Sequence, residues 1–223
     1  MKSWLIPEAS PEFVCAMENV LEVYERAYDP LYPVVNLDES PKQLVSEVRK
    51  SFTDRHGLVH QDYEYSREGV ADLYMIVEAL AGRREVQVEE NHSSQTYAKI
   101  IAHIAERMYP QAKQITIVED NLSAHKLSAL YEIMDAARAR AIINRIQVVR
   151  TPKHGSWLNI AEAELSVLTR CGLKKRTPDK ETLQQDAKAW YERRNNQEKK
   201  VNWQFTTKHA RIKLKHLYPL FTA

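Results

Sequence analysis

The sequence predicts an α/β fold in which helices cover the faces of a β-sheet. In the first half of the chain, three strand-like runs separated by short turns follow a first buried strand. After them the pattern alternates between helix and strand and ends in an amphipathic helix. This order is typical of a sheet with helices packed against it. At 223 residues the chain can bury a sizeable core, although length alone does not decide between one large domain and one and a half average ones.

The first predicted elements are a helix and a strand. Residues 9–27 carry apolar side chains at helical spacing, with Ser10 in a capping position and Pro11 in the first turn. Residues 32–38 are predicted to form a buried strand, and Pro41 soon after it opposes a direct continuation into a helix.

A series of strands comes next in the chain. We predict strands over residues 58–65, 71–80 and 83–89, because these runs are rich in apolar and β-branched residues. Short turns near Gly69 and Gly82 would separate them and produce two hairpins.

Helices and strands alternate in the second half of the chain. Residues 94–109 have one apolar face at helical spacing, and Pro110 ends this helix. The remaining predicted elements are a strand at 115–118, a helix at 127–144, a strand at 146–149, a helix at 159–171 and an amphipathic helix at 178–195. Thr177 is the predicted cap of the last helix.

Charge is unevenly distributed along the chain. The formal net charge is +2, but residues 166–223 contain 14 Lys and Arg against 5 Asp and Glu. The rest of the chain is therefore net acidic, and the basic end favours an anionic partner. A solvated basic helix explains the same bias, so charge alone leaves this simpler interpretation and nucleic-acid binding equally open.

Composition excludes several classes of protein. The five glycines are too widely spaced for a dinucleotide fingerprint or a Walker-type phosphate loop. Cys15 and Cys171 lack metal-ligand spacing, so we predict no disulfide framework and no structural zinc, and expect both thiols to be reduced and buried. The N-terminus has no signal-peptide core, and the apolar run at 73–80 is too short to span a bilayer. We therefore expect a cytoplasmic protein with no membrane partner.

Two carboxylates stand at the ends of predicted strands. Asp38 ends the strand at 32–38, and Asp120 follows the apolar run at 115–118. If these strands are neighbours, the two side chains lie side by side, and such close anions raise each other's pKa unless a cation intervenes. Mg²⁺ and Mn²⁺ prefer oxygen ligands and are the natural cations. Each aspartate alone is better explained as a turn or helix cap, so this hypothesis depends on their pairing.

A third carboxylate, Glu162, has two interpretations. Asn159 is a predicted N-cap, and Glu162 stands three residues further on, as in a capping box. The same glutamate could instead join the two aspartates at a metal site. Composition and spacing do not choose between a cap and a ligand.

Three motifs, taken in order, resemble a known enzyme family. They are Leu-Asp-Glu-Ser at residues 37–40, Asp-Asn-Leu-Ser-Ala-His at 120–125 and Leu-Asn-Ile-Ala-Glu at 158–162. Together they resemble the catalytic core of the DDE transposases of bacterial insertion sequences related to mariner elements, and the resemblance extends over nearly the whole chain. It implies a ribonuclease-H-like fold with a mixed five-stranded sheet and helices on both faces.

The resemblance also implies an active site. Its acidic triad corresponds to Asp38, Asp120 and Glu162, which would hold two Mg²⁺ or Mn²⁺ ions and catalyse DNA strand cleavage and strand transfer. Asn121 and His125 would stand behind the triad and orient a carboxylate or a phosphate, although a helix cap explains His125 equally well.

The glutamates next to the triad, Glu39 and Glu164, become neighbours of the metal site rather than ligands. The implied partner is double-stranded DNA, namely transposon ends and a TA-type target, bound by a homodimer that would be associated with the nucleoid. The side chains expected to contact its phosphates are Lys153, His154, Lys174, Lys175, Arg176, Arg193 and Arg194. A solvated loop explains Lys153 and His154 equally well.

We divide the chain into an N-terminal helix and linker at 1–30, a DDE catalytic domain at 31–200 and a basic C-terminal extension at 201–223. Members of the family ordinarily begin with helix-turn-helix DNA-binding domains, and we expect these to be absent here. The gap between the second and third acids is longer than is usual in the family, which fits extra turns in the helix at 127–144.

Two alternatives to a transposase stay open. A general ribonuclease-H-like nuclease would hydrolyse DNA without joining strands. A truncated or frameshifted remnant would keep the acids but only bind DNA.

Overall fold

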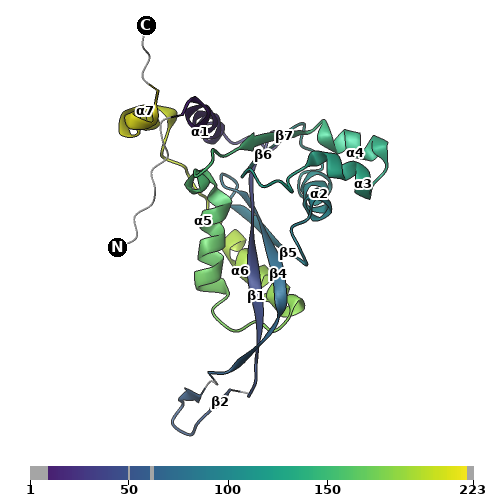
Figure 1. The fold of residues 1–223 in the computed structure, drawn as a ribbon, viewed down its shortest axis with the longest axis vertical. Helices are drawn as coiled ribbons and strands as arrows, with labels where there is room; N and C mark the ends of the chain where they lie inside the picture. Colours follow the sequence, from purple (N-terminus) through teal and green to yellow (C-terminus); the bar gives the residue numbers. More distant parts are fainter. Residues whose placement is uncertain (1–9, 50, 61–62, 220–223) are drawn as a thin grey trace.

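The structure, a computed structural model, describes residues 10–49, 51–60 and 63–219. Its centre is a five-stranded sheet with the strand order β5-β4-β1-β6-β7 (Figure 1). The strands are β1 (Val34–Glu47), β4 (Tyr65–Glu78), β5 (Arg83–Glu89), β6 (Ile115–Glu119) and β7 (Ile146–Arg150). β4 is antiparallel to β1 and β5, whereas β6 is parallel to β1 and β7. The predicted mixed five-stranded sheet is confirmed.

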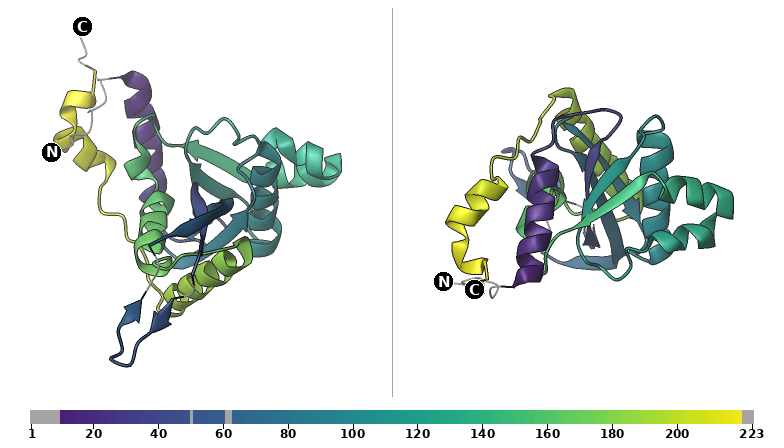
Figure 2. Two further views of the ribbon diagram at one scale, coloured as in Figure 1. Left: turned by 60° about the horizontal axis from the view of Figure 1, so that its bottom comes forward. Right: turned by 90° about the horizontal axis from the view of Figure 1, so that it is seen from above.

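Helices pack against both faces of this sheet (Figure 2). One layer contains α2 (Ser94–His103), α3 (Leu130–Ile133) and α4 (Ala136–Ile143). The opposite layer contains α5 (Ile160–Val167) and α6 (Lys180–Asn196). A third group, α1 (Pro11–Tyr24) and α7 (Thr207–Lys213), packs together, and α1 also lies against β7. The predicted α/β class, with helices on both faces, is confirmed.

Strand β1 sends alternate side chains into the two helical layers. Val35 and Leu37 belong to the core that contains α2, whereas Leu44 belongs to the core that contains α5 and α6. Because the side chains of a strand alternate with a period of two, Asp38 is on the same face as Leu44, and Glu39 is on the same face as Leu37. The side chains of these two adjacent acids therefore leave opposite faces of β1.

The strands differ from the prediction in length. β1 continues to Glu47 through Pro41, which is tolerated because β6 pairs only with Val34–Asn36 and leaves one edge of β1 open beyond that point. The turn predicted near Gly69 is wrong: β4 passes through it, and the irregularity is a register shift between Leu44 and Val45 of β1.

The strand predicted at 58–65 is also wrong. Val59–His60 (β3) pairs with Phe52–Thr53 (β2) in a separate two-stranded sheet, and β4 begins only at Tyr65. Residues 61–62 of that prediction lie outside the described residues.

The helices differ from the prediction mainly at their ends. The helix predicted at 127–144 is broken, because the side chain of Asp135 caps a new helix by accepting a hydrogen bond from the N–H of Arg138. Asp179, not Thr177, caps α6, since its side chain accepts a hydrogen bond from the N–H of Thr182. Ser10 caps α1 as predicted, whereas residue 9 lies outside the described part of the chain.

The prediction about the cysteines is wrong. Cys15 and Cys171 are free thiols, but both are exposed rather than buried. Trp190 in α6 is buried in the core. Within the described ranges, every helix is too short or too polar to cross a bilayer.

Candidate active site

The three predicted acids line one open hollow with a volume of about 960 Å³. Asp38 comes from β1, Asp120 directly follows β6, and Glu162 is in the first turn of α5. Asn36 of β1 pairs with Val118 of β6, so each aspartate stands two residues beyond a paired position on adjacent parallel strands. The sheet register thus places the two aspartates at the same level, as the sequence predicted for neighbouring strands.

Asp38 has the most perturbed carboxyl group of the hollow. Burial, followed by the negative charges of Glu39, Asp120 and Glu162, raises its pKa to about 7. The group is therefore only partly ionised at neutral pH unless a cation offsets the surrounding charge. This cluster of oxygen donors fits a hard divalent cation such as Mg²⁺ or Mn²⁺.

The structure removes the capping interpretation of Glu162. Asn159 caps α5 alone, because its side-chain oxygen accepts a hydrogen bond from the N–H of Ala161 at 3.1 Å. The N–H of Asn159 donates to the carbonyl of Ser156, not to Glu162, so no capping box forms. The exposed side chain of Glu162 is left to face the hollow.

Asn159 also connects α5 to β1. Its side-chain amide donates a hydrogen bond to the carbonyl oxygen of Leu37 at 3.0 Å, and the residue is buried. Leu37 directly precedes Asp38, so one buried amide joins the strand of the first acid to the helix of the third. The relative position of Asp38 and Glu162 therefore depends on this contact.

A buried ion pair holds α5 from its other side. The guanidinium of Arg84, whose side chain is fully buried, donates two hydrogen bonds of 2.9 Å to the carboxylate of Glu164. Arg194 of α6 donates a third, also of 2.9 Å, to the same carboxylate. The side chain of Asn195 binds the backbone N–H and carbonyl of Arg84. Glu164 does not line the hollow, and its partners position the helix that carries Glu162.

A second group of titratable side chains lies on the other face of β1. The Nε2 atom of His125 is 3.1 Å from Glu39 Oε2, and its Nδ1 atom is 3.4 Å from Asp120 Oδ1. The imidazole is buried and stacks on the ring of Tyr97, with 4.6 Å between ring centroids. The Tyr97 hydroxyl donates a hydrogen bond of 2.7 Å to Glu119.

Two overlapping sets of residues have the chemistry of metal ligands. Potential ligand atoms of Glu39, Asp120 and His125 all lie within 4.8 Å of one another. Burial opposes a charge on His125, but the hydrogen bond with Glu39 and the charges of Glu119, Glu39 and Asp120 outweigh it and raise the pKa of the imidazole. The raised pKa favours the protonated imidazole, which has no lone pair for a metal and offsets the nearby carboxylates. We therefore favour the open hollow as the metal site.

Glu39 is the functional residue that the sequence analysis undervalued. It was expected to be a neighbour of the metal site rather than a ligand, and it contacts His125, which in turn lies beside Asp120. Strand alternation contained the signal, because the residue after Asp38 must face the opposite helical layer.

Asp120 is followed by a tightly held loop. Its Oδ1 atom accepts a hydrogen bond of 2.9 Å from the N–H of Leu122. The side-chain amide of Asn121 donates to the carbonyl of Thr151 at 2.5 Å, which joins this loop to the segment after β7. Lys153 and His154 line a different hollow, of about 1030 Å³, beside α1. Neither residue lines the hollow that contains the three acids.

The other predicted DNA-binding residues fall into two groups. Lys174, Lys175 and Arg176 line a hollow of about 1020 Å³ on the surface near β1 and β4. Arg193 of α6 is exposed, whereas Arg194 is occupied by its ion pair with Glu164 and lies 5.2 Å over the ring of Trp190.

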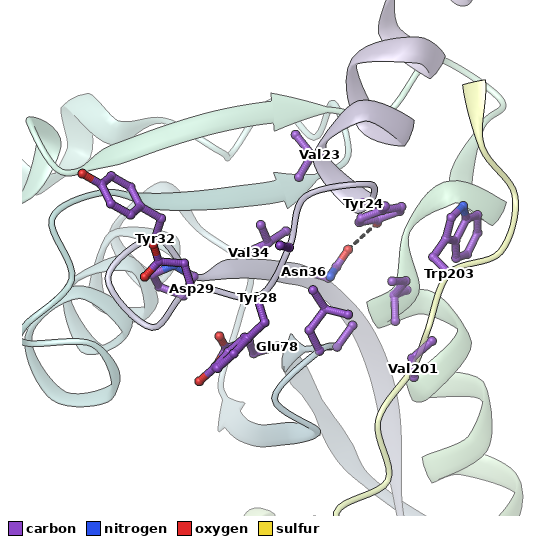
Figure 3. Close-up of a pocket in the computed structure, with 15 residues that line it drawn as sticks. Val23, Tyr24, Tyr28, Asp29, Tyr32, Val34, Asn36, Glu78, Val201 and Trp203 are labelled. Atoms are coloured by element: carbon purple, nitrogen blue, oxygen red, sulfur yellow. Dashed lines mark hydrogen bonds between the residues drawn. The ribbon is translucent and has the colours of Figure 1, made fainter. Parts of the chain in front are cut away.

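A further hollow, of about 430 Å³, lies near the start of β1 (Figure 3). The Tyr24 hydroxyl is within hydrogen-bonding distance of the Asn36 side-chain oxygen and lies 2.7 Å from the carbonyl oxygen of Leu158. Trp203 packs against Tyr24, with 5.2 Å between ring centroids. These contacts fasten α1 to β1, which carries Asp38, and to the segment before α5, which carries Glu162.

Comparison with known families gives a match over most of the chain. Residues 33–184 match the model of a family described as DDE superfamily endonuclease. A search of the curated proteins finds no match.

Comparison with solved structures identifies the fold. The Mos1 mariner paired-end complex with Mn is similar with a TM-score of 0.56 and 17% identity, over 97% of this chain and 65% of that one. The Mos1 complex with Mg has a TM-score of 0.55 and 14% identity, over 99% and 67%. The Mos1 strand transfer complex has a TM-score of 0.51 and 13% identity, over 89% and 63%. This chain thus spans about two thirds of the length of these proteins, and the implied ribonuclease-H-like fold is confirmed.

Proposed function

Because this chain belongs to the DDE superfamily endonucleases, we propose that it is the catalytic domain of a transposase that cleaves and transfers DNA strands at transposon ends. The observation that carries this proposal is the convergence of Asp38, Asp120 and Glu162 on one open hollow. Their charges act together on Asp38, whose raised pKa indicates a site that a cation would complete.

Asp38, Asp120 and Glu162 are the residues that would hold two Mg²⁺ or Mn²⁺ ions. When bound, such ions activate the attacking oxygen and stabilise the leaving oxygen of a phosphodiester. The carboxylates supply the negative charge and oxygen donors for them, and the hollow is wide enough to admit a phosphate from solvent.

The surrounding residues fix where these carboxylates stand. His125 lies beside Asp120 and compensates the charge of Glu39, so that the second acid has a defined position. Asn159 and the Arg84–Glu164 pair do the same for α5, which carries Glu162. The rate enhancement from positioned catalytic groups is largest when such contacts already hold those groups in place before the substrate binds.

The proposed partner is double-stranded DNA, with transposon ends as the cleaved sites and a TA dinucleotide as the target. A homodimer on paired ends would fit this substrate. The divisions at 1–30, 31–200 and 201–223 stay predictions, and the sheet together with α5 and α6 falls within the proposed catalytic domain.

The proposal is tested with a duplex made from the DNA that flanks the reading frame, including any inverted repeats identified there. We expect the purified chain to nick this duplex with Mg²⁺ or Mn²⁺, and to join a pre-cleaved 3′ end to a target duplex. Asp120→Asn removes one carboxylate charge with little change in shape, so it should abolish both products. Lys113→Ala, a change at an exposed position, serves as the control.

Other outcomes overturn the proposal in distinct ways. Nicking without joining would make the chain a general nuclease of this fold. DNA binding without any product in either metal would make it a non-catalytic remnant, and products that persist in Asp120→Asn would exclude the acidic hollow as the active site.

A further inference from the structure

A second hollow, distinct from the acidic one, is lined by positive side chains. Its ten lining residues include five Lys or Arg and no Asp or Glu. We call it the cationic hollow; its positive residues are Lys42, Arg67, Lys174, Lys175 and Arg176. Lys42 comes from β1, Arg67 from β4, and the other three from the segment between α5 and α6. Only the last three are among the predicted DNA-binding residues.

Most of these charges have no internal counter-charge. Within the described ranges, none of Lys42, Arg67, Lys174 and Lys175 takes part in an ion pair. Four like charges around one hollow repel each other, and a bound anion would relieve this repulsion. The arrangement therefore fits an anionic ligand rather than a solvated surface.

The segment that carries three of the charges is fixed to the sheet. The carbonyl of Thr177 accepts a hydrogen bond of 2.8 Å from the N–H of Val45, on the edge of β1 that β6 leaves open. The guanidinium of Arg176 donates to the carbonyl of Glu64 at 3.0 Å and lies 5.7 Å over the ring of Tyr65. These contacts define the hollow before any ligand binds, so little ordering is needed on binding.

The cationic hollow stands at a fixed distance from the three acids. Lys42 is four residues beyond Asp38 on the same strand, so both side chains are on the same face, about 13 Å apart along β1. On the opposite wall, Arg170 lines the acidic hollow and Lys174 lines the cationic one. The two hollows are therefore consecutive along one face, separated by about four base-pair steps of B-form DNA.

We propose that the cationic hollow binds backbone phosphates of duplex DNA, about four nucleotides from the phosphate that the acidic hollow cleaves. This inference rests on the proposed function and assigns to Lys42 and Arg67 a role that no motif indicated. Phosphate contacts of this kind set the position of the strand and carry no sequence information. The ligand they require is a continuous polyanion that reaches both hollows.

The first test measures how DNA binding depends on salt. Binding of a fluorescent random-sequence duplex of about 30 base pairs is followed by anisotropy in EDTA, so that no cleavage is needed. We expect Lys42→Ala/Arg67→Ala to reduce the slope of log K against log salt by about 2, because each lost phosphate contact removes about one unit. The matched control is Lys99→Ala/Lys113→Ala, which removes the same charge from exposed positions outside both hollows and should leave the slope unchanged.

Two results would overturn the inference. One is a salt slope in Lys42→Ala/Arg67→Ala that equals that of the wild-type chain, and the other is an equal reduction of the slope in both double variants. Melting temperatures of both variants establish that they are folded. A hollow variant that loses binding to duplex RNA but not to duplex DNA would also overturn it. Because metal is absent, this test stands even when the chain fails to cleave.

The second test locates the contact. Single neutral methylphosphonate groups are placed along the duplex, and the cleavage site of the wild-type chain provides the reference position. A neutral group about four nucleotides from that site should weaken binding by the wild-type chain but not by Lys42→Ala/Arg67→Ala. An equal weakening in both proteins would place the phosphate elsewhere. Failure to cleave would instead count against the proposed function, while the salt slopes would still decide the binding site.

Discussion

Asp38 and Glu39 are adjacent in β1, yet the two sides of the strand treat their charges differently. Asp38 faces the hollow with Asp120 and Glu162, and its pKa is raised to about 7. Glu39 also lines this hollow, but its carboxylate lies 3.1 Å from Nε2 of His125, whose raised pKa favours a compensating positive charge. Glu39 thus has a cationic partner within the protein, whereas the negative charge around Asp38 is left for an external cation. Strand alternation alone allows neighbouring acids to have such different roles.

The largest expected difference between the two sides is in catalysis. Asp38→Asn should lower the rate of metal-dependent cleavage by roughly 10⁴-fold, because it removes a proposed ligand from the reacting centre. Glu39→Gln should lower it by about 10- to 100-fold, as residues behind a metal site typically do. Single-turnover rates on an end-bearing duplex at saturating Mn²⁺ measure both. Equal losses in the two variants would contradict the distinction between them.

The next largest effect is expected in stability, on the side of Asp38. Glu164→Ala leaves the buried guanidinium of Arg84 without its carboxylate and should lower the free energy of unfolding by about 3–5 kcal/mol. Glu22→Ala, on α1, is the matched control, and it should change the free energy by less than about 0.5 kcal/mol. Urea denaturation followed by circular dichroism measures both values.

Glu164→Gln sharpens this prediction further. The amide keeps one acceptor for Arg84 and Arg194, so we expect this variant to fold. If α5 positions Glu162, the cleavage rate of the variant should depend differently on Mn²⁺ concentration. A change in stability with no change in metal dependence would make the pair purely structural.

The smallest expected effect is the pH dependence of stability without metal. The pKa of Asp38 is raised on folding, so the folded state retains this proton over a pH range where the unfolded state has lost it. The stability contributed by this group is therefore fully present below about pH 4 and is lost as pH rises through about 7. Asp38→Asn should flatten this part of the profile.

Divalent metal should reverse the trend. Mn²⁺ binds the ionised carboxylates, so we expect it to raise the melting temperature more at pH 8 than at pH 5. Thermal scans of the wild-type chain and Asp38→Asn measure this difference. A metal-induced shift that is the same in both proteins would place the ion outside the acidic hollow.

The sequence predicted the sheet and the three acids better than it predicted the residues that hold these acids in position. The motif order indicated the family correctly, and the apolar runs located β5, β6 and β7 within a residue at each end. The local sequence pattern gave wrong strand ends where pairing with a segment far away in the chain determines the length of the strand. β1 extends through Pro41 because β4 pairs with it from Asn36 to Glu47, which no window of sequence reveals.

The supports of the site depend on contacts between residues far apart in the chain. Arg84 and Glu164 are 80 residues apart, and Glu39 and His125 are 86 apart. Arg194 was expected to contact DNA because it belongs to a basic run, but the structure shows it bound to Glu164. Charge counts along a chain do not reveal which charges are neutralised internally, so the basic run included a residue that is already paired within the protein.

The length of β1 between Asp38 and Lys42 has a consequence for how such a chain can vary. Inserting one residue there would turn Lys42 toward the opposite helical layer, and inserting two would restore its face but move it by about 7 Å, or two base-pair steps. A single insertion would also turn Leu44 out of the core that contains α5 and α6 and shift the pairing with β4, so we expect it to lower stability as well. Insertions are expected to be tolerated beyond Glu47, in the segment that contains β2 and β3, because the proposed spacing between the two hollows does not depend on the length of that segment.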